Sequence, residues 1–319
     1  MADRPHSARR AAYFERLSAA LPALTSQYAM RQAPHALLVS GPFGVGKASL
    51  AAQLAMALLC TGVDRPCHAC PDCKKAQART HPNLLVVAAA EKQRSVKVEQ
   101  ARTLLVSLST HPFSPGPRVV LLQAVDIFTP QAQNALLKAI EEPDPATFFL
   151  LTCQNEQAVL STIRSRCQTL RLPPWPEALV HELLLSQGLE KEETTRLSTL
   201  CMGSPGLALR IRGDAAFWAV KALCEDTLLS LSDYSQLPRA SARLREEKDR
   251  AALVLDYAEA AAVRLLSDPG QGQPGQHRAR SLLEGVLKAR RQQASNLSWQ
   301  AISDSLLIKI LEETVPCPL

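Results

Sequence analysis

The sequence has few aromatic residues and little net charge for its length. Aromatic side chains make up 4% of its 319 residues, which argues against an all-β fold, because β-sheets depend on aromatic and β-branched residues. The 36 basic and 30 acidic residues leave a net charge of +6. This excess permits contact with nucleic acid but is smaller than a DNA-wrapping protein would carry. The length predicts two or three domains.

Long hydrophobic runs are also missing. No apolar stretch reaches the roughly 18 residues that a transmembrane helix needs, and residues 1–10 are basic and polar, without the apolar segment of a secretory signal. We therefore expect a cytoplasmic protein that does not enter a membrane. In that compartment, nine cysteines indicate metal binding or packing rather than disulfides.

Short apolar runs alternate with helical patterns between residues 36 and 172. Strands are expected at Ala36–Ser40, Leu84–Ala88, Val119–Gln123, Thr147–Thr152 and Thr169–Leu172, and helices at Tyr13–Gln32, Lys47–Leu59, Val98–Thr110, Pro130–Glu142 and Gln157–Ser165. This alternation predicts an α/β domain whose parallel sheet carries helices on both faces. The run Pro-Pro-Trp-Pro at 173–176 interrupts it, and only helical patterns follow. We expect an α/β domain over 1–172, a small helical lid over 173–212 and a helical bundle over 213–319.

A glycine-rich loop, Gly41-Pro-Phe-Gly-Val-Gly-Lys47, joins the first expected strand to the helix that follows it. Gly41, Gly44 and Gly46 allow a tight turn that points backbone N–H groups at a phosphate, and Lys47 would reach the terminal phosphates. The flanking strand and helix favour a P-loop fold over a glycine-rich turn without function.

Two side-chain types that ATP hydrolysis needs are absent from this candidate site. A hydroxyl should follow Lys47 and hold the magnesium ion, but Ala48 stands there, and Ser49 is rotated about 100° further around the helix. An acidic pair should end the third strand, but the sequence has Gln123-Ala124, and we interpret the nearby Asp126 as a helix or turn cap. The pattern predicts no hydrolysis and leaves the binding of ATP or ADP open.

Four cysteines with the spacing C-x6-C-x2-C-x2-C follow the P-loop helix, at Cys60, Cys67, Cys70 and Cys73. Four thiolates close a tetrahedron around zinc, so the cluster predicts a structural zinc site without an open position for catalysis. An iron–sulfur cluster is the alternative. The ferredoxin pattern, however, ends with C-x3-C-P after its first three cysteines, whereas Lys74 follows Cys73 here. His68 and His81 are nearby candidate ligands that are more simply explained as loop residues.

Two further motifs would each be an ordinary helix end if they stood alone. They are Asn134-Ala-Leu-Leu-Lys-Ala-Ile-Glu-Glu-Pro143 and Ser161-Thr-Ile-Arg-Ser-Arg-Cys167. In this order, after a P-loop with a four-cysteine insertion, they resemble bacterial AAA+ clamp loader subunits, and in particular the delta-prime family of DNA polymerase III. The resemblance covers residues 36–172 and extends to Gly203-Ser-Pro-Gly206. The missing hydroxyl and acidic pair fit delta-prime, as does Gly206, where the ATP-hydrolysing tau/gamma subunits carry arginine.

The resemblance implies a non-hydrolysing subunit of a DNA-directed DNA polymerase holoenzyme. Its partners would be tau/gamma and delta subunits in a hetero-oligomeric ring, the sliding clamp and primed DNA, and residues 213–319 would form the collar. Arg166 would act in trans on the ATP site of a neighbouring subunit, with Ser165 helping to position it. Two alternatives remain: an active, tau/gamma-like AAA+ ATPase, and a zinc-bearing adaptor outside replication.

Overall fold

The chain forms two compact units, Met1–Leu207 and Ala208–Leu319. The computed structural model describes residues 20–312 except positions 91, 92, 94, 111–113, 269, 271 and 296. Residue 172, the first expected domain boundary, lies within the first unit, and the division into three domains stays a prediction. The part of the expected N-terminal helix at 13–19 lies outside the described residues.

Five parallel strands form the sheet of the first unit, in the order β2-β3-β4-β1-β5. They are β1 (Ala36–Ser40), β2 (Leu84–Val87), β3 (Arg118–Leu122), β4 (Thr147–Cys153) and β5 (Gln168–Arg171). Every residue of β1, β3 and β4 is buried, as expected for parallel strands that are covered on both faces and therefore consist of continuous apolar runs. The edge strand β5 is mostly exposed. The predicted parallel sheet is confirmed, with each strand end within one residue of its expected position.

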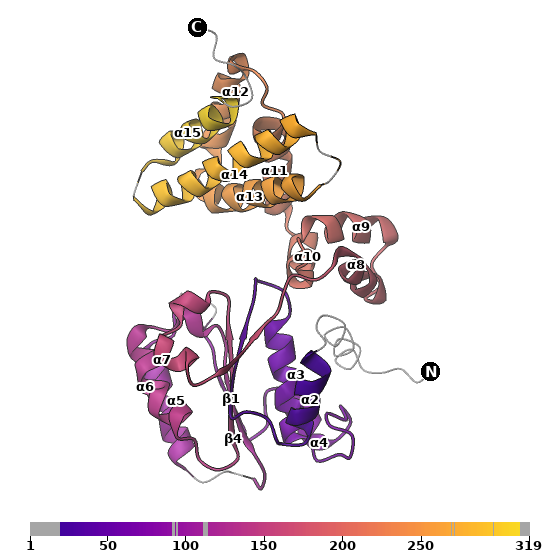
Figure 1. The fold of residues 1–319 in the computed structure, drawn as a ribbon, viewed down its shortest axis with the longest axis vertical. Coiled ribbons are helices and arrows are strands. Elements are labelled where there is room, and N and C mark those ends of the chain that lie inside the picture. The colour runs from indigo at the N-terminus through magenta and orange to yellow at the C-terminus, as the bar shows by residue number, and fades with distance from the viewer. Residues whose placement is uncertain are drawn as a thin grey trace. The chain divides into compact units, whose positions relative to one another are not determined.

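Helices lie on both sides of the sheet, as Figure 1 shows. They are α2 (Ala20–Ala29), α3 (Lys47–Leu59) and α4 (Pro71–Gln77) on one side, and α5 (Val98–Ser109), α6 (Pro130–Glu141) and α7 (Ser161–Arg164) on the other. The buried Arg118 side chain on β3 caps the end of α5, because it donates to the carbonyls of Leu108 (2.7 Å) and Thr110 (2.6 Å).

Two expected helical regions differ from the structure. Residues 157–165 do not form one helix. A 3-10 turn at Glu156–Ala158 precedes the short α7, because Val159 and Leu160 adopt extended backbone angles between them. Helix α4 was not expected within the cysteine loop. Pro71 at its first position and the Cys70 sulfur, which accepts a hydrogen bond from the backbone of Cys73, start this helix.

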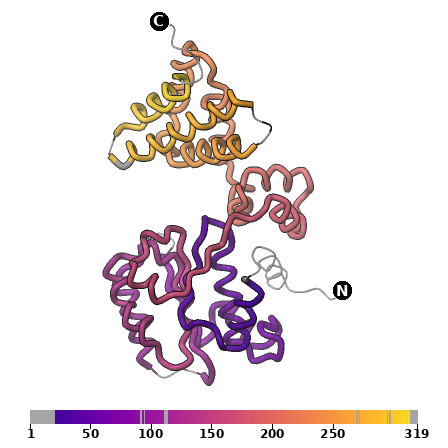
Figure 2. The backbone as a smooth tube through the Cα atoms, viewed as in Figure 1, coloured from indigo at the N-terminus to yellow at the C-terminus, as the bar shows by residue number. Residues whose placement is uncertain are grey.

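After β5 the first unit continues with helices only, and Figure 2 traces the chain through residues 172–176 into them. Helices α8 (Glu177–Ser186) and α9 (Lys191–Leu200) form an antiparallel hairpin, and α10 (Pro205–Arg212) crosses from the first unit into the second. Trp175 is only 5% exposed, so the proline-rich run between the sheet and the hairpin is anchored to the unit rather than free.

The second unit is helical throughout its described residues. Its helices are α11 (Ala215–Cys224), α12 (Leu237–Glu246), α13 (Ala251–Ser267), α14 (Gln273–Ala294) and α15 (Trp299–Glu312), with a π-helical turn at Glu225–Leu229. The buried indole of Trp299 donates to the carbonyl of Leu244 at 2.7 Å and joins α15 to α12. No helix among the described residues is long and apolar enough to cross a membrane. The predicted fold class, an α/β P-loop domain followed by helical parts, is confirmed.

Candidate nucleotide and metal sites

The glycine-rich loop lies between β1 and α3, at the carboxyl edge of the sheet, where open α/β sheets bind their ligands. Gly44 and Gly46 both have positive φ angles, 77° and 99°, which side-chain-bearing residues rarely adopt. Gly46 precedes the first residue of α3, Lys47. The sequence-predicted strand–loop–helix arrangement of a P-loop is therefore present.

The Lys47 side chain turns back onto its own loop. Its Nζ atom donates to the carbonyl oxygens of Gly41 (2.7 Å) and Pro42 (2.6 Å). Burial lowers the pKa of the Lys47 ammonium, against the smaller raising influence of Asp126 and Cys153. The Lys47 ammonium group, which binds phosphate in nucleotide-binding P-loops, thus forms its hydrogen bonds within the protein.

The next three carbonyls of the loop accept hydrogen bonds from a segment more than 100 residues later in the chain. The donor–acceptor pairs are Ser204 Oγ to Phe43 (2.6 Å), the Gly206 N–H to Gly44 (2.8 Å), and Trp175 Nε1 to Val45 (3.0 Å). We call these three bonds the lid latch. With the two bonds from Lys47, five consecutive carbonyls, those of residues 41–45, are engaged by groups of this chain.

The latch brings two glycines into direct contact. A Cβ atom on Gly206 would lie 2.7 Å from the Gly44 Cα atom, and one on Gly44 would lie 2.2 Å from the Ser204 hydroxyl oxygen. Real Cβ atoms do not approach other atoms so closely, so either side chain would displace the loop or the start of α10. Glycine fits at position 206 because it has no Cβ atom to collide with Gly44.

No acidic pair stands at the end of β3. Gln123 and Ala124 follow the strand, and the Ala124 N–H donates to Thr152 Oγ1 at 2.9 Å. One carboxylate oxygen of Asp126 accepts from the N–H groups of Gln154 and Asn155, both at 3.0 Å. The prediction of a turn cap for Asp126 is confirmed, although the turn that it caps follows β4.

Arg166 lies just beyond α7 and has two anchors. Its Nη1 donates to the carbonyl of Thr162 at 2.9 Å, and its Nη2 donates to Glu141 Oε1 at 2.7 Å. The hydrogen bond from Arg166 lowers the pKa of the Glu141 carboxyl. The Ser165 hydroxyl donates to the same Thr162 carbonyl at 3.1 Å. Arg166 is 32% exposed, so solvent reaches it. Its action in trans stays a prediction.

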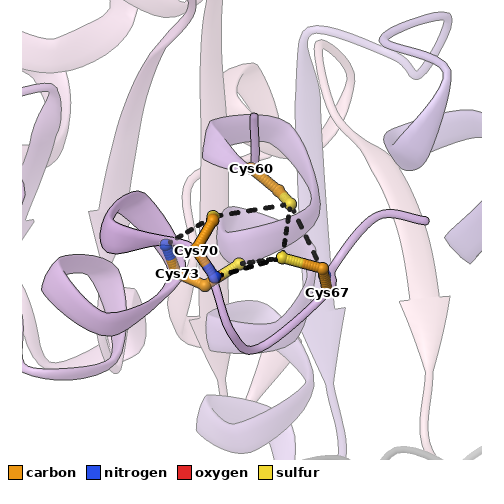
Figure 3. Close-up of side chains that lie close together, drawn as sticks. All are labelled: Cys60, Cys67, Cys70 and Cys73. Atoms are coloured by element: carbon orange, nitrogen blue, oxygen red, sulfur yellow. Dashed lines mark hydrogen bonds between the residues drawn. The ribbon is translucent and has the colours of Figure 1, made fainter. Parts of the chain in front are cut away.

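The four predicted zinc ligands come together between the end of α3 and the start of α4 (Figure 3). All four sulfurs lie within 4.8 Å of one another. Cys60 is 3.5 Å from Cys67 and 3.8 Å from Cys70, and Cys67 is 4.0 Å from Cys73. A tetrahedron with Zn–S bonds of 2.3 Å has sulfur separations of about 3.8 Å. The side chains therefore fit a metal ion of this size.

Backbone N–H groups surround the sulfurs. The Cys60 sulfur accepts from the backbone N–H groups of Gly62 and Cys67. The Cys67 sulfur accepts from the N–H of Cys70, and the Cys70 sulfur from the N–H of Cys73; all four distances are 3.3–3.4 Å. Burial raises the pKa of the Cys70 thiol, but hydrogen bonds from Cys73 and Thr61 outweigh it and bring the pKa to about 6. Burial raises the pKa values of Cys60 and Cys73. Donors directed at sulfur stabilise thiolates, the form that binds metal.

His68 and His81 are near the cysteine cluster in the sequence. In the described part of the chain, the group of side chains placed to hold a metal consists of the four cysteines. The buried His81 ring accepts from the Asn83 N–H at 3.0 Å through Nδ1, and its Nε2 lies 3.4 Å from Asp72. Because Asp72 lies in the first turn of α4, its contact with His81 ties the start of this helix to the loop that follows it. The expectation that His81 is a loop residue without a ligand role agrees with these bonds.

The roles of three residues in these sites were not predicted from the sequence. The sequence identifies Trp175 only as part of the proline-rich run at 173–176. Its signal is that a buried tryptophan needs a partner for its indole N–H. Ser204 carried no signal beyond its place in a glycine-containing break. Glu141 stood in a motif whose acidic end had no assigned partner, and no local pattern connects it to Arg166.

Comparison with known proteins relates the chain to replication proteins. The family described as "DNA polymerase III, delta subunit" matches residues 17–176. The delta-prime subunit of Haemophilus influenzae is 34% identical over 55% of this chain and 54% of that protein. The tau subunit of Escherichia coli is 33% identical over 58% of this chain and 29% of that protein. A solved gamma subunit-related protein from Thermotoga maritima overlaps 92% of this chain and 99% of its own, with 18% identity and a TM-score of 0.46.

The matched region spans about half the length of the delta-prime relative. The family match over residues 17–176 contains the glycine-rich loop, the four cysteines, both helix-end motifs and all five strands of the sheet. Because the family match extends over half of the chain, the chain belongs to the DNA polymerase III delta-subunit family, with delta-prime subunits among its relatives.

Proposed function

We propose that this chain is a clamp loader subunit of the delta-prime type that does not hydrolyse ATP. The observation that carries the proposal is the phosphate loop, in which five consecutive carbonyls are engaged by the chain itself. Two of these bonds come from Lys47, which must instead reach the β- and γ-phosphates if ATP is to be cleaved. The loop serves in this proposal as an attachment point for the lid.

The residues that would activate a nucleotide are missing independently of the loop. Ala48 offers no hydroxyl to magnesium, and Gln123 and Ala124 offer no carboxylate to the metal or to the attacking water. Asp126, the nearest carboxylate in sequence, uses one oxygen to cap the turn after β4. Retained ATP or ADP would therefore be bound without turnover, and only after the bonds of Lys47 rearrange.

The chain's contribution to ATP hydrolysis would be Arg166, acting on a neighbouring subunit. A guanidinium keeps its charge at every physiological pH and can bind two phosphate oxygens at once. Arginines supplied in trans accelerate phosphoryl transfer by about 10³ to 10⁵ in related systems. The neighbour would be a tau/gamma-type ATPase, in a ring that also holds delta and loads the sliding clamp on primed DNA in the cytoplasm. Tau is among the relatives of this chain.

The cysteine cluster would hold one structural zinc ion. Four sulfurs at near-tetrahedral separations leave no position for water or substrate. Cys60 follows the end of α3, and Cys70 and Cys73 lie at the start of α4. The metal would join these two helices through a loop that has little apolar core.

The deciding experiment compares ATP turnover by the purified chain with turnover by a complex reconstituted with tau/gamma-type and delta subunits, clamp and primed DNA. We expect none from the chain alone, and a large loss of DNA-stimulated turnover in the complex with Arg166→Ala. Turnover by the isolated chain that disappears with Lys47→Ala would establish the tau/gamma-like alternative. Failure to assemble with the tau/gamma-type subunits would favour the adaptor outside replication.

A further inference from the structure

We propose that Glu141 is a positioning residue for Arg166: its carboxylate fixes the plane of the guanidinium that acts on the neighbouring subunit. The inference rests on the proposed trans role of Arg166. Glu141 is the last residue of α6, and Arg166 follows α7. The ion pair between them, 2.7 Å long, joins the two motifs that carry the family resemblance.

The two anchors of Arg166 lie on different atoms of the guanidinium. Glu141 binds Nη2 and the Thr162 carbonyl binds Nη1. With only one anchor, the planar group could rotate about that bond, whereas two anchors on its two terminal nitrogens define its orientation. Each terminal nitrogen has a second hydrogen beyond the bond described. These hydrogens are the donors that a phosphate would use.

Folding stability is a poor explanation for this pair. The Glu141 side chain is 52% exposed and that of Arg166 is 32% exposed, and ion pairs at such sites contribute little to stability. Orientation matters more, because small errors in the placement of a catalytic group are costly in rate. The adjacent Glu142 is also exposed, and in this part of the structure the ion pair of Arg166 is formed by Glu141. Glu142 therefore provides a matched control.

The test uses the reconstituted complex with clamp and primed DNA, and measures kcat and KM for DNA-stimulated ATP turnover. We expect Glu141→Ala to lower kcat by roughly ten- to a hundredfold, with KM for ATP within about twofold of the parent, since a transition-state contact and not ground-state binding is lost. Glu141→Gln keeps an acceptor oxygen and should retain an intermediate kcat. Glu142→Ala should leave both parameters unchanged.

A double variant separates positioning from general damage to the fold. In the Arg166→Ala background, Glu141→Ala should cause no further loss, because a positioning residue has nothing left to position. A further loss in that background would mean that Glu141 acts on the fold, and would overturn the inference. An increase in turnover with Glu141→Ala would overturn it too, because the pair would then restrain Arg166 in an inactive position.

The two levels of the proposal fail in distinguishable ways. If Arg166→Ala lowers turnover and Glu141→Ala does not, the positioning role is wrong and the trans role stands. If Arg166→Ala itself has no effect, the proposed function is wrong. Thermal unfolding of the Glu141 variants should stay within about 2 °C of the parent. A larger decrease in both the alanine and the glutamine variant would assign Glu141 a structural role.

Discussion

The backbone N–H of Gly206 donates to the carbonyl of Gly44 over 2.8 Å and thereby joins the start of α10 to the middle of the phosphate loop. By the family resemblance, residue 206 is the position at which tau/gamma subunits carry an arginine. Here the backbones of two glycines meet instead. The loop therefore makes a contact between two parts of one unit.

Enlarging Gly206 should weaken this contact. In Gly206→Ala the new Cβ would lie 2.7 Å from Gly44 Cα and 2.9 Å from its carbonyl oxygen, so the loop or the helix must shift. We expect a loss of about 1–3 kcal/mol in the free energy of unfolding, measured by denaturant titration. Gly213→Ala is the control, because a Cβ there meets no atom within 4 Å. Equal effects of the two substitutions would contradict the latch.

The indole of Trp175 should contribute to the same latch through one hydrogen bond. Trp175→Phe keeps an aromatic ring but leaves the buried Val45 carbonyl without its donor, which should cost about 1–3 kcal/mol. Backbone hydrogen exchange of the Gly206 N–H should accelerate as the latch opens more often. Trp299→Phe removes a similar buried indole bond in the second unit. That control should lower stability without changing exchange at Gly206, and equal exchange in both variants would exclude the coupling.

Much of the fold could be predicted because burial leaves a strong local signal. The strands β1, β3 and β4 are buried along their whole length, so each is a continuous apolar run. The start of α3 was equally clear, because Gly46 and Lys47 mark the change from loop to helix. Helix α4 was missed because a proline and sulfur hydrogen bonds start it, and no apolar periodicity reveals it.

The grouping of the four cysteines could be predicted, whereas the hydrogen bonds of the phosphate loop could not. Cysteine spacing is local information, and the structure brings all four sulfurs together. The bond between Trp175 and Val45 spans 130 residues of sequence, and the pair of Glu141 and Arg166 spans 25. Such contacts depend on how elements pack, and a single sequence without a structure holds no local pattern for them.

Loss of one cluster ligand should release the metal. Elemental analysis of the purified chain should find about one zinc per chain, and Cys70→Ser should reduce it to a small fraction. Because Cys60 and Cys73 have raised pKa values, they must release protons on binding, so zinc affinity in a chelator competition should fall as the pH is lowered. Cys224→Ala, which changes a buried cysteine of the second unit, should keep the metal. A parent protein without zinc would refute the assignment.

The ion pair at the end of β5 should make stability depend on pH in the acid range. Glu156 accepts hydrogen bonds from Arg171 at 2.7 and 2.8 Å and from the Ser40 hydroxyl, and these lower its pKa from 4.5 to about 2. A carboxyl whose pKa is lower in the folded state stabilises the fold above pH 4.5, and this contribution is lost as the pH falls towards 2. Because Arg171 is largely exposed, we expect Glu156→Gln to cost at most about 1 kcal/mol at pH 7.

The measurement is denaturant unfolding of the parent and Glu156→Gln between pH 7 and pH 2.5. The difference between the two proteins should be constant down to about pH 5 and should shrink below it, because the Glu156 carboxyl of the unfolded parent then takes up a proton that the folded parent does not, which favours the unfolded state. Arg171→Ala removes the donor that lowers the Glu156 pKa most, so it should flatten the same part of the pH profile while leaving the Ser40 bond in place. A difference between the parent and Glu156→Gln that stays undiminished at pH 2.5 would mean that packing around Glu156, and not its charge, joins β5 to the turn after β4.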